Sequence, residues 1–225
     1  MPHDHTFTEE ERRGVYRAIY ERRDVRSEFL PTPVPDDVLC RILDAAHHAP
    51  SVGFMQPWDF LVIRDKAVRQ AVHANFVRAK NKAAELYEGE KRSIYDNLKL
   101  EGILDAPVNV CVTCDSNRSK GSGLGRQTDP ATGLYSTVCA IQNLWLAARA
   151  ESLGVGWVSI MDLDELKATL AVPPHLTIVA YLCVGYTSAF HSQPELEASG
   201  WESREQLAKL IHFETWGRHQ EEQGR

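Results

Sequence analysis

The chain lacks the marks of a secreted or membrane-embedded protein. Its first residues, Met1 to His5, contain no apolar segment of the kind that forms a signal peptide. The longest apolar stretch, around residues 178–184, is far shorter than the roughly 20 residues that a membrane-spanning helix needs. The five cysteines are odd in number and widely spaced, which is typical of reduced thiols. We therefore expect a soluble, cytoplasmic protein.

The chain has fewer basic than acidic residues. Lys and Arg number 25 against 31 Asp and Glu, and the net charge of −6 argues against a general nucleic-acid-binding protein. No repeat or low-complexity tract divides the chain. Its 225 residues, 43% of them hydrophobic, suffice for a core that needs no metal or disulfide. We expect one domain over residues 1–225 and no bound metal.

The hydrophobic pattern predicts four strands interleaved with helices. We expect strands at 58–63, 108–113, 154–160 and 177–185, with the first one buried. We expect helices at about 8–22, 36–50, 134–150, 162–170 and 204–211. The polar helical stretch 66–100 has only a thin apolar face, which favours a pair of surface helices or a lid. Such an order predicts a single α+β or α/β domain.

A cluster of arginines follows the first predicted helix, in Glu21-Arg22-Arg23-Asp24-Val25-Arg26. Each guanidinium presents a planar fork that matches the oxygens of a phosphate, so the segment could bind an anion. The alternative is a solvated basic turn whose arginines pair with Glu21 and Glu28. Asp24 is then either a salt-bridge partner or an acid/base beside the anion, and both interpretations stay open.

The loop Ala49 to Trp58 mixes polar and flat apolar side chains. Ser51 and Gln56 offer hydrogen bonds, whereas Phe54, Met55 and Trp58 offer apolar surface, a mixture that suits a planar heteroaromatic ligand. The alternative is a structural turn whose apolar residues fill the core.

The late segment Gly154-Val155-Gly156-Trp157-Val158-Ser159-Ile160 is rich in glycine, which lets a backbone approach a ligand or a neighbouring strand. Ser159 has no Gly-x-Ser-x-Gly context, so a hydrolase is not indicated.

Two further motifs carry less weight. Cys111 and Cys114 form a CxxC within a predicted strand, where such positions face opposite sides, so a zinc site is not expected. The run from Gly121 to Arg126 is not a dinucleotide-binding GxGxxG. It lies in a long loop, 116–133, of the kind that is often functional, and it could contact a phosphate or a substrate.

Together these segments resemble the nitroreductase-like flavoprotein family. The order of parts is Arg-Arg-x-Val-Arg, then Pro-Ser-x-x-x-x-Gln-Pro-Trp, then a late Gly-rich strand. Those three segments, with Leu134 to Arg149, look like the BluB branch of the family, the 5,6-dimethylbenzimidazole synthases or flavin destructases. The resemblance covers about residues 10–217. Most nitroreductases carry Asn in place of Phe54 and a small residue in place of Asp24, so both positions depart from a simple reductase.

The resemblance implies a nitroreductase-like α+β fold with a mixed, mainly antiparallel sheet flanked by helices. It also implies a homodimer with FMN sites at the interface, a lid over 66–100 and a C-terminal arm over 200–225 that embraces the partner. The implied reaction is the oxygen-dependent fragmentation of reduced FMN to 5,6-dimethylbenzimidazole and erythrose 4-phosphate. This product is the lower ligand of cobalamin, and a separate flavin reductase could supply the reduced FMN.

The resemblance also implies roles for single residues. The implied catalytic residues are Asp24, near the ribityl C1′, and Ser159, at the flavin edge. The implied cofactor-binding residues are Arg22, Arg23, Asp24, Val25, Arg26, Ser51, Gly53, Met55, Gln56, Leu100, Gly156, Val158, Ser159 and Arg204.

Two other functions stay open on the sequence. The first is an NAD(P)H-dependent nitro- or quinone reductase that recycles its FMN, against which Asp24 and Phe54 speak. The second is a non-catalytic FMN carrier, whose site would need no candidate proton donor.

Overall fold

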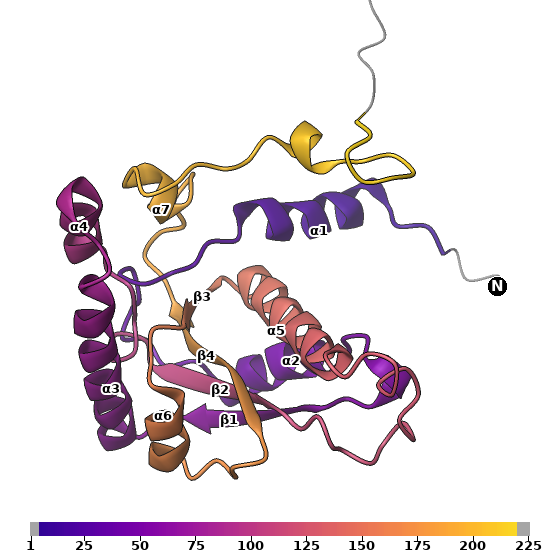
Figure 1. Cartoon of the computed structure of the whole chain (residues 1–225), viewed down its shortest axis with the longest axis horizontal. Coiled ribbons are helices and arrows are strands. Elements are labelled where there is room, and N and C mark those ends of the chain that lie inside the picture. Colours follow the sequence, from indigo (N-terminus) through magenta and orange to yellow (C-terminus); the bar gives the residue numbers. More distant parts are fainter. Residues whose placement is uncertain (1–4, 220–225) are drawn as a thin grey trace, which may run out of the picture.

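The computed structural model describes residues 5–219 and contains one four-stranded sheet with helices around it (Figure 1). The elements in chain order are α1 (Glu9–Glu21), α2 (Asp36–His47), η1 (Val52–Phe54), β1 (Trp58–Ile63), α3 (Lys66–Ala84), α4 (Gly89–Asn97), β2 (Val108–Cys114), α5 (Thr132–Ala150), β3 (Leu153–Val158), α6 (Leu163–Thr169), β4 (Thr177–Tyr186), α7 (Glu195–Ala198) and η2 (Leu207–Leu210).

The sheet has the strand order β1-β2-β4-β3, and every neighbouring pair of strands is antiparallel. The expected α+β class is confirmed. The expected mixed sheet is wrong for these strands, because the one parallel pairing found in residues 5–219 is an isolated bridge between Asp24 and Val155. That bridge attaches the arginine segment to the edge of β3.

Two hydrophobic clusters cover the two faces of the sheet. Alternate strand residues point to opposite faces, so Val110 lies in one cluster and Cys111 in the other. The first cluster includes Ile42 of α2 and Leu144 of α5. The second cluster packs the sheet against α3 and α6, and Figure 1 shows α3 and α5 on either side of the sheet.

Capping residues begin the helices where the sequence predicts. Thr8 and Glu11 form the expected capping box of α1, in which the Glu11 backbone N–H donates to Thr8 Oγ1 at 3.2 Å. Asp162 caps α6 by accepting a 2.9 Å bond from the Glu165 backbone N–H. The expected pair of helices within 66–100 is also confirmed as α3 and α4.

Three expectations about single elements are wrong. β1 is an edge strand with only Trp58 and Ile63 buried, so it is half-exposed and not a buried strand. β3 ends at Val158, because the chain turns there through a 3.1 Å bond from the Met161 N–H to the Ser159 carbonyl. The helix expected at 204–211 is only the short turn η2, since none of its residues is buried against a core that would stabilise a longer helix.

Helix α1 and the C-terminal segment, which we define as residues 187–219, lie outside the core and have no buried residues. α1 has no buried residue, although its sequence predicts an apolar stripe. Figure 1 shows the segment after α7 running beside α1. Both segments expose large apolar side chains, namely Phe7, Val15, Tyr16, Ile19, Tyr20, Leu207, Leu210, Ile211, Phe213 and Trp216. Within residues 5–219, no helix is long and apolar enough to cross a membrane.

Candidate functional site

A cavity of about 680 Å³ opens where α1 ends. Its lining brings the arginine segment together with α5 and the C-terminal segment, through Ile19, Tyr20, Arg22, Arg23, Asp24, Arg26, Gln142, Pro194, Glu195, Leu196 and Arg204. The wall therefore carries four arginines and only two carboxylates, Asp24 and Glu195, so its net charge is positive. The sequence predicted five of these residues, including the distant Arg204.

Backbone pairing fixes the arginine segment in place. The Val25 N–H donates to the Val155 carbonyl at 3.0 Å, which holds the segment along β3. Gly154 and Gly156 make room for this approach, because a Cβ on Gly156 would lie 2.2 Å from the Val25 carbonyl oxygen. The sequence suggested that these glycines admit either a ligand or a neighbouring strand. The structure shows that they admit a neighbouring backbone segment, residues 24–25.

Asp24 is held through both carboxylate oxygens. Its Oδ1 accepts a 3.0 Å bond from the Trp157 backbone N–H. Its Oδ2 accepts from Arg26 Nη2 at 2.5 Å and from Arg26 Nε at 3.1 Å. Asp24 is therefore a salt-bridge partner of Arg26 and, at the same time, part of the cavity wall.

The two glutamates that could have neutralised the arginine segment do not contact it. Glu21 pairs with Arg17 and Arg149, whereas Glu28 pairs with His191. In residues 5–219, neither Arg22 nor Arg204 has a carboxylate within ion-pairing distance. The interpretation as a basic turn paired with Glu21 and Glu28 is wrong.

Unpaired donors remain on the arginines. Arg23 Nε and Arg26 Nη1 are buried and have no hydrogen-bond partner in the described chain. The Arg22 guanidinium lies over the Trp145 ring, 4.7 Å from its centroid. Burial above all, with Arg23 and Arg204 nearby, lowers the pKa of Arg22 although Asp24 opposes the shift. A bound anion would relieve this crowding of positive charge and satisfy the buried donors.

The second predicted segment, Ser51 to Gln56, lies elsewhere in the chain. The Val52 N–H donates to Ser136 Oγ near the start of α5, whereas Trp145 Nε1 donates to the Arg23 carbonyl nine residues later. At 1.5 Å per residue, these anchors are about 14 Å apart along the helix. None of Ser51, Gly53, Met55 and Gln56 lines the cavity. A single chain therefore does not bring the two halves of the predicted site together.

The Ser51 to Gln56 loop has both of the characters that its sequence suggests. Met55 is buried at 2% exposure and fills the core, as a structural turn predicts. Phe54, in contrast, is 69% exposed. Ser51 Oγ accepts a 3.1 Å bond from the Gln56 backbone N–H and is thus engaged within the loop.

The remaining predicted residues lie near the cavity or the end of β3. Leu100 packs against the second core cluster. Two residues later the backbone touches the arginine segment, because a Cβ added to Gly102 would lie only 3.0 Å from the Arg26 carbonyl oxygen. Val158 is buried within β3, and Ser159 is exposed just beyond it. Neither lines the cavity.

The sequence did not predict the contributions of Gln142 and of Pro194 to Leu196, because polar helix residues and short turns carry no distinctive pattern. In residues 5–219, no cluster of His, Cys, Asp and Glu could hold a metal ion.

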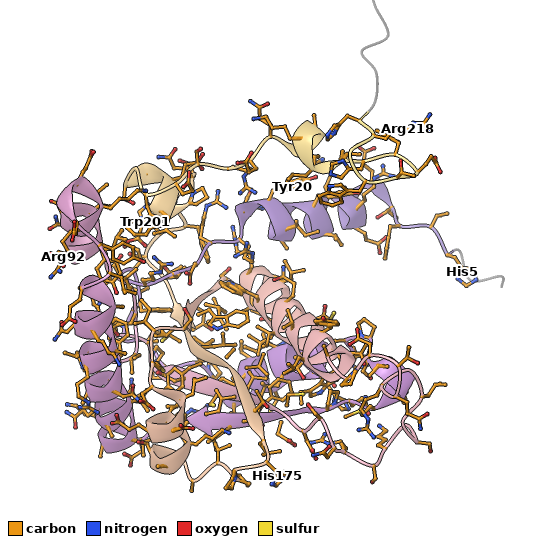
Figure 2. The ribbon with its side chains drawn as sticks, in the orientation of Figure 1. His5, Tyr20, Arg92, His175, Trp201 and Arg218 are labelled. Atoms are coloured by element: carbon orange, nitrogen blue, oxygen red, sulfur yellow. The ribbon has the colours of Figure 1, made fainter. Side chains whose placement is uncertain are left out.

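An aromatic cluster connects the helical pair 66–100 to the C-terminal segment. Trp201 lies 5.2 Å from Tyr87 and 6.3 Å from Tyr95, measured between ring centroids. Figure 2 shows Trp201 beside α4, the helix that carries Arg92. Trp201 lies in the chain between Pro194 to Leu196 and Arg204, which line the cavity. The aromatic cluster therefore connects the cavity wall to helices α3 and α4.

Comparison with known proteins assigns the chain to a family. The Nitroreductase family model matches residues 19–186, and the chain therefore belongs to the nitroreductase family. Within that family it is similar to 5,6-dimethylbenzimidazole synthases. It is 45% identical to the enzyme of that name from Rhodospirillum rubrum over 193 residues, which cover 86% of this chain and 91% of that enzyme. It is 39% identical to one from Rhodobacter capsulatus over 196 residues, covering 87% and 94%.

Solved structures have the same fold. A BluB-like flavoprotein from Clostridium difficile 630 superposes with a TM-score of 0.67 at 20% identity, covering 88% of this chain and 98% of that one. Oxidized iodotyrosine deiodinase, bound to FMN and 3-iodo-L-tyrosine, superposes with a TM-score of 0.67 at 23% identity, covering 79% and 91%. The expected nitroreductase-like fold is confirmed.

Proposed function

We propose that this chain is a 5,6-dimethylbenzimidazole synthase, which uses O₂ to fragment reduced FMN and releases 5,6-dimethylbenzimidazole, erythrose 4-phosphate and the remaining atoms of the pyrimidine ring. The observation that carries the proposal is a carboxylate, Asp24, in the wall of an arginine-lined cavity. The sequence identity of 39–45% to proteins named as such synthases supports the same reaction.

The cavity fits the phosphate end of FMN. Arg22, Arg23, Arg26 and Arg204 converge on it, and two of these side chains have buried N–H groups without partners. A phosphate accepts such bonds in bidentate fashion. The volume of about 680 Å³ lies within the range of roughly 300–1,000 Å³ that is usual for small-molecule sites.

A homodimer would complete this site. The arginine cavity and the Ser51 to Gln56 loop lie at different positions along α5, so a two-fold axis could place one chain's loop beside its partner's cavity. The exposed apolar side chains of α1 and of the C-terminal segment supply a surface for such an association. The described part of the expected 200–225 arm ends at residue 219, and 220–225 lie outside the described residues.

The proposal gives distinct roles to the residues of the chain. The bound FMN supplies the reactive ring system, with O₂ as the oxidant. Asp24 holds or takes a proton at the ribityl C1′, and Ser159 donates a hydrogen bond at the flavin edge. The 66–100 helices act as a lid that keeps bulk water from the ring, with Leu100 at its base.

One experiment tests the proposed reaction. Purified protein is mixed with chemically reduced FMN in air, and the mixture is analysed by chromatography. We expect net loss of flavin and the appearance of 5,6-dimethylbenzimidazole. Flavin that survives, together with consumption of NAD(P)H in a parallel mixture that contains NAD(P)H and an electron acceptor, would instead indicate a reductase. Binding of FMN with neither reaction would indicate a carrier.

A further inference from the structure

The long loop between β2 and α5 is built around the Ser51 to Gln56 loop. A Cβ on Gly121 would lie 2.4 Å from the Gly53 carbonyl oxygen, so the two backbones touch. Arg126 closes the long loop on itself by donating to the Ser116 carbonyl at 2.7 Å and to the Arg118 carbonyl at 3.0 Å. The run from Gly121 to Arg126 is thus a support for the second half of the candidate site.

The supported loop has an unusual backbone. Phe54 and Gln56 have φ values of 53° and 50°, in the left-handed region that residues other than glycine rarely occupy. Such conformations persist where the surroundings hold them, and they cluster at ligand sites. Here Arg118 Nη1 donates a 2.6 Å bond to the Gln56 carbonyl and fixes that backbone.

Lys120 contacts the side chains of both left-handed residues. Its Nζ donates to Gln56 Oε1 and lies 4.7 Å from the centroid of the Phe54 ring. The charge of neighbouring Arg118 is balanced by Asp59 at 2.5 Å and by Asp115 at 3.8 Å. No carboxylate of the described chain lies within ion-pairing distance of Lys120. Its ammonium is therefore an uncompensated cation on the exposed surface of this loop.

We infer that Lys120 is a positioning residue that presents Phe54 and Gln56 to the flavin ring and whose charge favours reduced over oxidised FMN. The inference rests on the proposed function, in which this loop meets the ring. The ring of reduced FMN carries a negative charge at neutral pH, whereas the oxidised ring is neutral. Because the phosphate is the same in both states, a cation near the ring changes the ratio of the two affinities.

The test measures that ratio without oxygen. FMN and dithionite-reduced FMN are titrated anaerobically into the full-length wild-type protein and into the Lys120→Met, Lys120→Gln and Lys120→Arg variants. We expect either neutral variant to lose about tenfold more affinity for reduced than for oxidised FMN, which equals about 1.4 kcal/mol. The midpoint potential of the bound flavin should fall by about 30 mV for this two-electron couple. Lys120→Arg should keep the wild-type ratio.

Lys167→Met, which removes a lysine of α6 that lies in neither half of the candidate site, is the matched control and should leave both affinities unchanged. Equal losses for the two redox states in the neutral variants would overturn the electrostatic role of Lys120. No loss in either state would overturn both its roles. A wild-type chain that binds no FMN would overturn the proposed function itself and, with it, this inference.

Discussion

At the scale of single residues, Asp24 has the geometry for both of the roles that the sequence offered as alternatives. Its Oδ2 pairs with Arg26, while its Oδ1 is fixed by the Trp157 backbone N–H. Its side chain also remains 29% exposed. Such a carboxylate is oriented by its neighbours and still reachable from the cavity, which is what an acid/base beside a bound anion requires.

Asp24→Asn should separate binding from chemistry. The amide oxygen can still accept the Trp157 bond, whereas the ion pair with Arg26 is lost and that guanidinium becomes free for the phosphate. We expect the Kd for oxidised FMN to be no weaker than in the wild type. The rate of 5,6-dimethylbenzimidazole formation should fall by roughly 10²–10⁴-fold, because one proton-transfer group is removed. Fluorescence titration and chromatographic assay measure the two quantities.

The control is Asp44→Asn, which removes the same charge from an exposed position on α2. It should change neither quantity. Product formation at a near wild-type rate in Asp24→Asn would show that the carboxylate has no part in proton transfer.

At the scale of elements, the close contact between β3 and residues 24–25 determines where Asp24 lies. Gly156 permits it, since any side chain there would meet the Val25 carbonyl oxygen. Gly156→Ala must therefore displace one of the two segments. We expect a loss of roughly 1–3 kcal/mol in the free energy of unfolding, the usual cost of overpacking, together with weaker FMN binding. Urea denaturation and FMN titration are the measurements.

Gly14→Ala provides the matched comparison. A Cβ at this position on α1 meets nothing within 4 Å. Alanine is also the better helix former by about 1 kcal/mol, so this variant should be as stable as the wild type or more so. If Gly156→Ala unfolded at the same urea concentration as the wild type, the packing role of that glycine would be refuted.

The elements also show how far the sequence could predict this fold. Strongly patterned elements such as α2, β2, α5 and β4 were predicted closely, because buried apolar faces are visible in the periodicity. The end of β3 and the η2 turn were not, because a tight turn between Ser159 and Met161 ends the strand and the residues of η2 have no core to pack against. The cavity was predicted from its arginines, whereas Gln142 and Pro194 joined it only through tertiary packing.

At the scale of the whole molecule, the exposed apolar side chains of α1 and the C-terminal segment predict a dimer. Light scattering should give twice the chain mass of 25.3 kDa. A double variant, Leu207→Asp with Leu210→Asp, places two charges among side chains that are 71% and 60% exposed. We expect a monomer that binds FMN at least tenfold more weakly, because the two halves of the site no longer meet.

Lys209→Asp changes the charge within the same turn without touching an apolar side chain, and it should remain a dimer. A monomeric double variant with wild-type FMN affinity would contradict a site at the interface.

The capping box of α1 has a consequence for the kinetics of assembly. Thr8 and Glu11 close the first turn, and Arg17 pairs with Glu21 at 3.0 Å in the last, so local bonds hold a helix that buries none of its residues. We expect these bonds to favour the helix already in the single chain, before two chains meet. Encounter then needs no coil-to-helix step, and the association rate should be governed by diffusion and orientation rather than by folding.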